Sequence, residues 1–556
     1  MIRVADYIAD FIYQQGVRDV FMLSGGGSIY LDDGIACHDK LNHICARNEA
    51  AAPMMAEAYA RVTGKIGVVY VTTGPGGTNA ISGVAEAWTD SVPIVMISGQ
   101  VGTEHIINEG PRSFGVQGFN IVKSVNPLTK YAVVVTEPES IRYHLEKAVY
   151  LARSDRPGPV WVDVPLDVQK AMVDESQLAG YDIKEREGRS VAIAENVGAL
   201  MALLRNAKRP VFVGGNGVRI SGGKDEFKKL AERLNVPVVL TRLTGDLLPY
   251  SHKNNFGCAG ISGRKSANLI LKNSDLIVSF GCRLAPPFLG EDFQFFPEAG
   301  RLAAVDIDAT ELDKHRERID LAIEADAKDV LHTILNEVEA DRAGDYAGWI
   351  EQCEEWVKDY PTTVPADRRD PINLYYLISR VDKLSRPKTI FVTDAGTSYH
   401  IAEQVLCFED GKREITSGAL AAMGLAIPFS VGCSAADREA QVVILTGDGS
   451  MELNVQELKT ISYYDLNVKV FIMNNGGYVT IKNIQDKLCD GRYIGSERPD
   501  KSEMLDLEKV AAAFDLPYKR IDKCDEVDEK IVEIINTDGP VFVDVVCDKN
   551  QTLIES

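Results

Sequence analysis

The sequence predicts an α/β protein made of three doubly wound domains, each built on a parallel sheet. Short runs rich in Val and Ile alternate with amphipathic helical segments along all 556 residues, and many of these runs end in Gly or Asp. Such continuous apolar runs are typical of strands in a parallel sheet that helices cover on both faces. A chain of this length also exceeds what a single hydrophobic core can organise.

Two polar segments predict where the chain divides. Residues 179–190 are rich in charge and Gly, and residues 359–371 in Pro and charge, as is typical of linkers. They predict a first domain over 1–180, a middle domain over 190–345 and a third domain over 370–556, each near the usual domain size. The expected strands lie at 67–73 and 92–98, then at 210–215, 236–241 and 275–281, and finally at 389–394, 441–448, 469–475 and 540–546.

Composition excludes several classes of partner. The net charge of −21 and the pI near 5.0 would repel a phosphate backbone, so no nucleic-acid partner is expected. The 10 cysteines form no CxxC pair or Cys/His cluster, which indicates a reducing compartment. Residues 1–17 predict a helix with internal charges rather than a signal peptide, and no apolar run reaches the roughly 18 residues that span a membrane. We therefore expect a cytoplasmic protein without a membrane partner.

The strongest chemical signal is the segment LTGDGSMELNVQELKTISYYDLNVKVFIMNNGGY at 445–478. Asp448 ends one predicted strand, a helix follows, and Asn475 ends the next strand. Because the carboxyl ends of adjacent parallel strands meet at one edge of a sheet, we expect these two side chains to lie together. Their oxygens suit Mg²⁺, which normally also takes phosphate oxygens. Gly449 and Ser450 at the helix start offer N–H groups to an anion, so the segment predicts a metal–diphosphate site.

This segment resembles the thiamin-diphosphate motif. The order of the three units is similar to the pyrimidine-binding, middle and diphosphate-binding domains of the thiamin-diphosphate-dependent enzymes. Within that family the chain looks most like the acetolactate synthase group, the large catalytic subunit, and the resemblance covers essentially the whole chain. It implies thiamin diphosphate and Mg²⁺ as cofactors, with Asp448, Asn475 and the carbonyl of Gly477 as metal ligands.

The resemblance carries over further contacts in the third domain. The segments DAGTSYH (394–400), SGALAAMG (417–424) and NNGGYVTI (474–481) match turns around the cofactor. They imply phosphate contacts from Gly396, Thr397 and Ser398. The carbonyl of Ala421 would accept the 4′-amino group, and Met423 would be the apolar wedge that bends the cofactor. The side chains that would cover the cofactor are Tyr478, Val479 and Ile481.

The first domain contains an acid with two open interpretations. Glu49 leads into the apolar stretch AAAPMMAEAYA, where an acid commonly sits at a helix start. The resemblance instead implies the catalytic glutamate that hydrogen-bonds N1′ of the aminopyrimidine. It also places Pro75 and Asn79, from TTGPGGTNA (72–80), near the pyrimidine. Gln117 matches a substrate-side catalytic glutamine, although the residues alone fit a solvated loop glutamine equally well.

The chain departs from the acetolactate synthase pattern on the acceptor side. Asn48 stands where the group usually has His, Pro287 where an acceptor-binding Arg falls, and Ile484 where a Trp helps to select the acceptor. The segment 102–117 is longer than its counterpart. Because an Arg normally grips the carboxylate of a second 2-keto acid, these changes favour a different acceptor.

The middle domain resembles the group's FAD-binding domain in GGNGVRISGG (214–223), GCAGISG (257–263) and DIDATELDK (306–314). Glycine-rich turns after strands bind dinucleotides, but they also occur as plain turns. Family members hold FAD, hold ADP or leave this domain empty, and all three states stay open.

Together these observations predict an enzyme that decarboxylates a 2-keto acid, with pyruvate favoured, and transfers the acyl unit to a carbonyl acceptor such as a keto sugar or an aldehyde. A simple decarboxylase or C–C lyase is the main alternative; an FAD-dependent oxidase and a non-catalytic relative of the fold are the others. The family forms its site between subunits, which implies at least a homodimer and favours a homotetramer.

Overall fold

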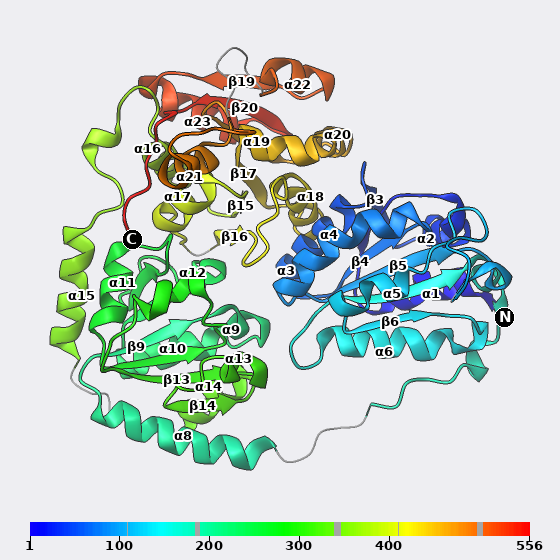
Figure 1. Cartoon of the computed structure of the whole chain (residues 1–556), viewed down its shortest axis with the longest axis horizontal. Helices are drawn as coiled ribbons and strands as arrows, with labels where there is room; N and C mark the ends of the chain where they lie inside the picture. The colour runs from blue at the N-terminus through cyan, green and yellow to red at the C-terminus, as the bar shows by residue number, and fades with distance from the viewer. Residues whose placement is uncertain (108, 184–188, 338–345, 410, 497–503) are drawn as a thin grey trace.

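Three six-stranded sheets succeed one another along the chain in the computed structural model, which describes residues 1–107, 109–183, 189–337, 346–409, 411–496 and 504–556 (Figure 1). Neighbouring strands within each of these sheets are parallel. The predicted fold class of three parallel-sheet α/β domains is therefore confirmed. The predicted linker over 179–190 and the predicted end of the middle domain at 345 lie partly outside the described residues.

The first sheet has the strand order β3-β2-β4-β5-β7-β6. Its strands are β2 (Asp19–Met22), β3 (Asn42–Cys45), β4 (Gly67–Val71), β5 (Ile94–Gln100), β6 (Tyr131–Val134) and β7 (Val160–Pro165). A separate antiparallel pair joins β1 (Ile2–Arg3) to β8 (Met172–Val173). The helices are α1 (Val4–Gln14), α2 (Ile29–Cys37), α3 (Ala51–Thr63), α4 (Pro75–Thr89), α5 (Ile121–Val125), α6 (Ile141–Arg153) and α7 (Leu166–Lys170).

The third sheet repeats the topology of the first, with the order β16-β15-β17-β18-β20-β19. Its strands are β15 (Thr389–Thr393), β16 (Arg413–Ile415), β17 (Gln441–Gly447), β18 (Val468–Asn474), β19 (Tyr518–Ile521) and β20 (Val541–Val546). Its helices are α16 (Leu374–Leu384), α17 (Thr397–Val405), α18 (Ala426–Ala436), α19 (Asp448–Met451), α20 (Leu458–Tyr463), α21 (Val479–Cys489), α22 (Leu507–Ala513) and α23 (Val527–Asn536).

The middle sheet follows a different order, β11-β10-β9-β12-β13-β14. Counted along the chain this is the order of dinucleotide-binding doubly wound sheets, whose ligand crevice lies where the order reverses, between β9 and β12. The strands are β9 (Pro210–Gly214), β10 (Val238–Leu240), β11 (Asn255–Cys258), β12 (Leu276–Phe280), β13 (Arg301–Asp306) and β14 (Leu321–Glu324). The helices are α8 (Arg189–Asn206), α9 (Asn216–Ile220), α10 (Lys224–Leu234), α11 (Lys265–Asn273), α12 (Pro286–Leu289), α13 (Ala309–Asp313), α14 (Ala327–Glu337) and α15 (Ala347–Asp359).

Every strand predicted from a Val/Ile run is present, as β4, β5, β9, β10, β12, β15, β17, β18 and β20. The pattern does not predict the edge strands β3, β6, β11, β14, β16 and β19. Most of these edge strands carry exposed or half-buried side chains, so they lack the continuous apolar run of a central strand. It also misses three inner strands, β2, β7 and β13; β7 contains the buried polar residue Asp163.

The first and third domains share one hydrophobic core, whereas the middle domain has its own. Helices α3 and α18 pack against each other across the domain boundary (Figure 1). The approach is so close that a Cβ on Gly432 would lie 2.0 Å from the carbonyl oxygen of Met55. This packing joins the first domain to the face of the third sheet that α18 covers. Among the described residues, no helix is both long and apolar enough to cross a membrane.

Candidate functional site

Asp448 lies where β17 ends and α19 begins, next to the end of β18. Its Oδ1 accepts the N–H of Gly449 at 2.9 Å. Its Oδ2 accepts the N–H groups of Gly476 and Gly477 at 2.9 and 3.0 Å. These bonds tie together the two strand ends that the sequence pattern predicts at one sheet edge.

Asn475 follows β18 at the same sheet edge, and its side-chain oxygen is an unused hydrogen-bond acceptor among the described residues. The side chain is 6% exposed, and its Oδ1 accepts no hydrogen bond from any residue that the structure describes. An orphaned buried oxygen is costly unless a ligand pairs with it. The carbonyl of Gly477 accepts the N–H of Val479 at 2.9 Å and keeps its second lone pair.

These donors suit a hard cation that phosphate oxygens would share. Burial raises the pKa of Asp448 to about 6, and a bound cation would reverse that shift by stabilising the carboxylate. Within the described part of the chain there is no group of three or more His, Cys, Asp or Glu side chains that could hold a metal. One carboxylate, one amide oxygen and one carbonyl instead match Mg²⁺, which takes few protein ligands and completes its shell with phosphate and water.

The predicted phosphate contacts lie at the N-terminus of α17. Gly396 precedes the helix with φ 117° and ψ −158°, a conformation that essentially only glycine adopts. The Oγ of Ser398 is buried and has no hydrogen-bond partner among the described residues. The Oγ of Ser450 donates to the carbonyl of Ala395 at 2.8 Å, which joins the two turns. Thr397, also in the first turn of α17, lies 3.3 Å from Thr480 between their hydroxyl oxygens.

Asp394 organises this half of the site, and the sequence pattern does not single it out. Its carboxylate accepts N–H groups from Ala395 and Gly424 at 2.8 and 3.0 Å. It also accepts the hydroxyl of Thr446 at 3.0 Å. The residue thereby connects two of the segments that carry predicted cofactor contacts, 394–400 and 417–424, to the end of β17. The sequence signal that could have identified Asp394 is its position at the carboxyl end of β15.

The covering residues differ in exposure. The ring of Tyr478 packs so tightly on Gly449 that a Cβ there would lie 2.6 Å from a ring carbon. Val479 is buried, whereas Ile481 is 45% exposed on α21. Met423 is half-buried.

The first domain brings its predicted residues together at the N-terminal ends of α3 and α4. The Nδ2 of Asn79 donates to Oε2 of Glu49 at 3.0 Å. Gln117 lies against the turn before Pro75, since a Cβ on Gly74 would lie 2.5 Å from its carbonyl oxygen. The residue that caps α3 is Ala50, with no side-chain capping bond. The carboxylate of Glu49 therefore contacts Asn79 instead of capping the helix.

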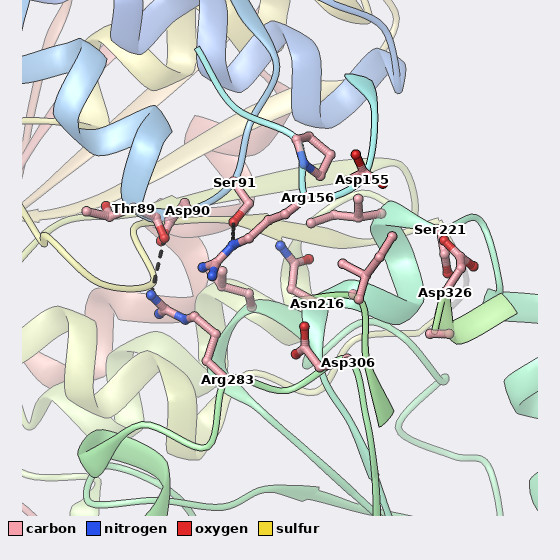
Figure 2. A pocket seen from close by; sticks show the side chains of 17 residues that line it. Thr89, Asp90, Ser91, Asp155, Arg156, Asn216, Ser221, Arg283, Asp306 and Asp326 are labelled. Atoms are coloured by element: carbon pink, nitrogen blue, oxygen red, sulfur yellow. Dashed lines mark hydrogen bonds between the residues drawn. The ribbon is translucent and has the colours of Figure 1, made fainter. Parts of the chain in front are cut away.

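A cavity of about 90 Å³ lies between the first and middle domains, at the ends of β9, β12 and β13 where the strand order reverses (Figure 2). It includes Asn216 from the first predicted glycine-rich segment and Asp306 from the third. Arg156 and Arg283 also line it. Acids next to a strand end can bind ribose hydroxyls, so this part of the lining fits a nucleotide. The two arginines are already engaged, Arg156 with Asp308 and Glu311 and Arg283 with backbone carbonyls.

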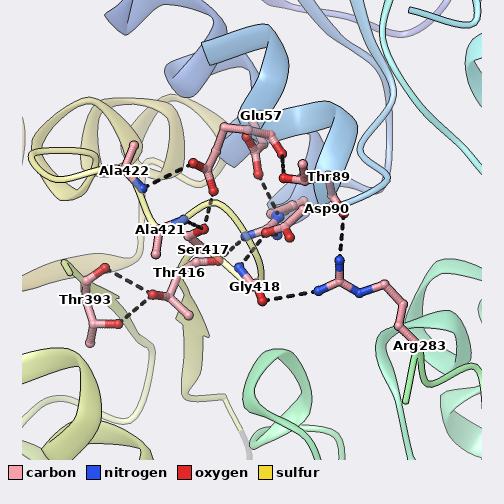
Figure 3. Close-up of polar contacts among 12 residues, drawn as sticks. Glu57, Thr89, Asp90, Arg283, Thr393, Thr416, Ser417, Gly418, Ala421 and Ala422 are labelled. Atoms are coloured by element: carbon pink, nitrogen blue, oxygen red, sulfur yellow. Dashed lines mark hydrogen bonds and ion pairs between the residues drawn. The ribbon is translucent and has the colours of Figure 1, made fainter. Parts of the chain in front are cut away.

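The three domains meet at the segment 416–422 (Figure 3). Ser417 donates its Oγ–H to Glu86 and accepts the N–H of Ala421 at 2.7 Å. The N–H of Gly418 donates to Asp90 at 2.7 Å. From the middle domain, Arg283 donates to the carbonyl of Gly418 at 3.2 Å (Figure 3).

This junction holds the predicted cofactor segment in an unusual conformation. Ala421 has φ 53°, in the left-handed region that favours glycine. Arg61 joins the junction from α3 by donating to Asp90 at 2.6 Å and to the carbonyl of Thr416. Burial also raises the pKa of the Glu57 carboxyl well above its usual range (Figure 3). Glu86, Asp90 and Ser417 are thus positioning residues that the sequence pattern does not identify.

Three family models match successive parts of the chain. Residues 2–119 match the thiamine pyrophosphate enzyme N-terminal TPP binding domain, residues 197–334 the central domain of that enzyme family, and residues 394–545 its C-terminal TPP binding domain.

Curated relatives align over nearly the whole chain. It is 31% identical to the acetolactate synthase isozyme 1 large subunit of Escherichia coli, over 98% of this chain and 94% of that protein. A probable acetolactate synthase large subunit of Methanocaldococcus jannaschii is 31% identical over 99% of this chain and 92% of its own length. The chloroplastic acetolactate synthase 2 of Nicotiana tabacum is 30% identical over 98% of this chain and 82% of its own length.

Proposed function

The chain belongs to the thiamine pyrophosphate enzymes, in their acetolactate synthase-like group, and on that premise we propose its reaction. It decarboxylates a 2-keto acid, with pyruvate the favoured donor, and transfers the acyl unit to a carbonyl acceptor. The observation that carries the proposal is the unpaired Oδ1 of Asn475 beside the pinned carboxylate of Asp448. If both residues were only structural, that buried oxygen would keep the free-energy cost of an acceptor without a hydrogen bond.

Each half of the site has a role in this proposal. Asp448, Asn475 and the carbonyl of Gly477 hold Mg²⁺, and the N-termini of α17 and α19 hold the diphosphate. Thiamin diphosphate, when bound, supplies the electron sink for decarboxylation. Glu49 holds and moves the proton at N1′ of the pyrimidine, and Asn79 orients its carboxyl group. The junction at 416–422 positions the carbonyl of Ala421 for the 4′-amino group, and Met423, the next residue after the junction, is the apolar wedge.

The acceptor is proposed to be a keto sugar or an aldehyde rather than a second 2-keto acid. Pro287, where a carboxylate-binding Arg would fall, is exposed at the start of α12. Arg283 is engaged with backbone, since it donates to the carbonyls of Thr89 and Gly418 at 3.2 Å each. Pro287 has no guanidinium and that of Arg283 is already hydrogen-bonded to backbone, so neither residue offers a free guanidinium to the carboxylate of an acceptor.

We propose a homodimer as the minimal assembly and a homotetramer as the full one. Exposed apolar side chains gather on both half-sites, which supports their burial between subunits. On the first domain these are Phe114, Val116 and Phe119, and on the third Leu420, Leu453, Ile481, Ile484 and Leu488. The cysteines are all free, which supports a reducing compartment such as the cytoplasm.

Purified protein supplied with thiamin diphosphate, Mg²⁺ and pyruvate is expected to release CO₂, faster when a suitable carbonyl acceptor is present. Detecting the carboligation product by mass spectrometry distinguishes this from a simple decarboxylase, which releases free aldehyde at the same rate without an acceptor. Absence of CO₂ release with every 2-keto acid and acceptor tested would overturn the proposal.

We also propose that the cavity between the first and middle domains binds the nucleotide part of FAD or ADP. Heat-denatured protein is expected to release a nucleotide that chromatography identifies, and a yellow protein absorbing near the flavin maximum would assign FAD. If the purified protein carries none, titration with FAD and with ADP is expected to show one binding event per chain. No binding of either would contradict this part of the proposal.

A further inference from the structure

A second cavity, of about 310 Å³, lies where the first, middle and third domains meet. It shares Asn216 and Ile220 of α9 with the nucleotide cavity but extends toward the end of α3 and to β16. The lining residues are Ala60, Arg61, Gly64, Lys65, Ser91, Val92, Pro93, Arg153, Pro157, Asn216, Arg219, Ile220, Leu243, Arg413, Glu414 and Ile415. None of them is among the residues assigned to thiamin diphosphate or Mg²⁺, although Ser91, Pro157 and Leu243 also line the nucleotide cavity.

The charge on this lining is strongly unbalanced. Five basic side chains converge on it from all three domains, namely Arg61, Lys65, Arg153, Arg219 and Arg413. The acid on the lining, Glu414, is already paired with Arg242 at 2.8 Å. Three of the five have carboxylate partners outside the cavity, since Arg61 pairs with Asp90 at 2.6 Å, and Asp246 lies 2.5 Å from Arg219 and 3.7 Å from Arg413.

Arg413 shares Asp246 with Arg219, and Arg153 has no carboxylate partner among the described residues. The Nε of Arg413 is buried without a hydrogen bond to any described residue, and the carboxylate of Asp246 lies 3.7 Å from it. Burial, with Arg219 beside it, lowers the pKa of Arg413 to about 10. Arg153 makes no hydrogen bond or ion pair within the described part of the chain, and it is exposed to solvent. Lys65 donates to the carbonyl of Gly16 at 2.9 Å, not to an acid.

We propose that this cavity binds a small organic anion that carries more than one negative charge, such as a phosphate ester or a diphosphate. A single carboxylate would neutralise one of the uncompensated cations, whereas a phosphate or diphosphate presents several oxygens to a cluster of guanidinium and ammonium groups. Val92, Pro93, Ile220 and Leu243 form an apolar wall for the organic part of the ligand. This site is separate from the diphosphate contacts of the proposed cofactor site.

The test uses enzyme saturated with thiamin diphosphate and Mg²⁺, so that the cofactor site is filled, and inorganic pyrophosphate as the probe. Calorimetry is expected to show one saturable event per chain, and the melting temperature is expected to rise with pyrophosphate. Arg413→Met and Arg153→Ala are each expected to weaken binding about tenfold or more, because each removes a charged hydrogen-bond donor. Acetate, a monoanion, is expected to bind far more weakly.

A second readout separates a binding role from a structural one. Without pyrophosphate, Arg413→Met is expected to melt at a temperature near that of the parent, because its longer ion pair is lost while Asp246 stays paired with Arg219. Arg316→Ala removes the same charge from an exposed ion pair and is the matched control; it is expected to leave binding unchanged. Lack of saturable binding, unchanged binding in both cavity variants, or an equal loss in Arg316→Ala would overturn the proposal.

Discussion

Glu49→Gln is expected to lower the rate of CO₂ release from pyruvate by about 10²–10⁴-fold with the fold intact, the usual range for loss of a general acid–base group. Glutamine keeps the size of the side chain and its contact with Asn79, which now donates to the Glu49 carboxylate at 3.0 Å. It cannot hold a proton for N1′ of the pyrimidine. Steady-state CO₂ release at saturating thiamin diphosphate measures the effect.

The control for this variant is another acid-to-amide change in the same domain. Glu139 is exposed, and Glu139→Gln is expected to retain the parent rate. A melting temperature near that of the parent would show that Glu49→Gln is folded. An unchanged rate in Glu49→Gln would contradict the catalytic role of Glu49, whereas the assignment of the metal residues would stand.

Asn475→Leu is expected to weaken the binding of thiamin diphosphate and Mg²⁺ by about 100-fold or more, because a metal ligand is lost while the volume is nearly kept. Without cofactor the variant is expected to be as stable as the parent or more so. The change removes a buried oxygen that has no partner in the described structure, and such a group typically costs about 1–3 kcal/mol. Calorimetric titration of the cofactor and thermal unfolding of the cofactor-free protein measure the two effects.

The neighbouring residue provides a matched control. Asn474 is the last residue of β18, and its Nδ2 donates to Asp544 at 2.9 Å. Asn474→Ala is expected to lower stability by about 1 kcal/mol through the lost hydrogen bond, with cofactor affinity retained. The reverse pattern, in which Asn475→Leu lowers stability and leaves cofactor affinity unchanged, would show that Asn475 is structural.

The meeting of Asp448 and Asn475 at one sheet edge is predictable because the sequence pattern that indicates it is local. Asp448 and Asn475 each follow a continuous apolar run, and a helix of ordinary length separates them. Chain direction and parallel pairing are then enough to bring the two residues to one sheet edge. The same logic holds for Ser398, which follows β15 at that edge and has an unpaired buried hydroxyl among the described residues.

The residues that hold the cofactor segment are not predictable in this way. Glu86 and Asp90 lie toward the end of α4, where their pattern is that of an ordinary helix, and their partners Ser417 and Gly418 lie in another domain. The basic cavity is likewise assembled from side chains such as Arg153 and Arg413 that lie far apart in the sequence. Such contacts depend on how the domains pack, for which one sequence contains no short-range pattern.

By itself the sequence determined the three parallel-sheet domains, the family resemblance and the strand ends that carry the candidate metal and diphosphate residues, because hydrophobic periodicity and motif spacing are local properties of the chain. Only the tertiary structure decided the strand order of the middle sheet, the junction at 416–422 where the three domains meet, and the pairing of Glu49 with Asn79 in place of a helix cap. Those features arise from contacts between segments distant in sequence, for which the sequence contains no local pattern; the junction also depends on the packing of α3 against α18 between the first and third domains.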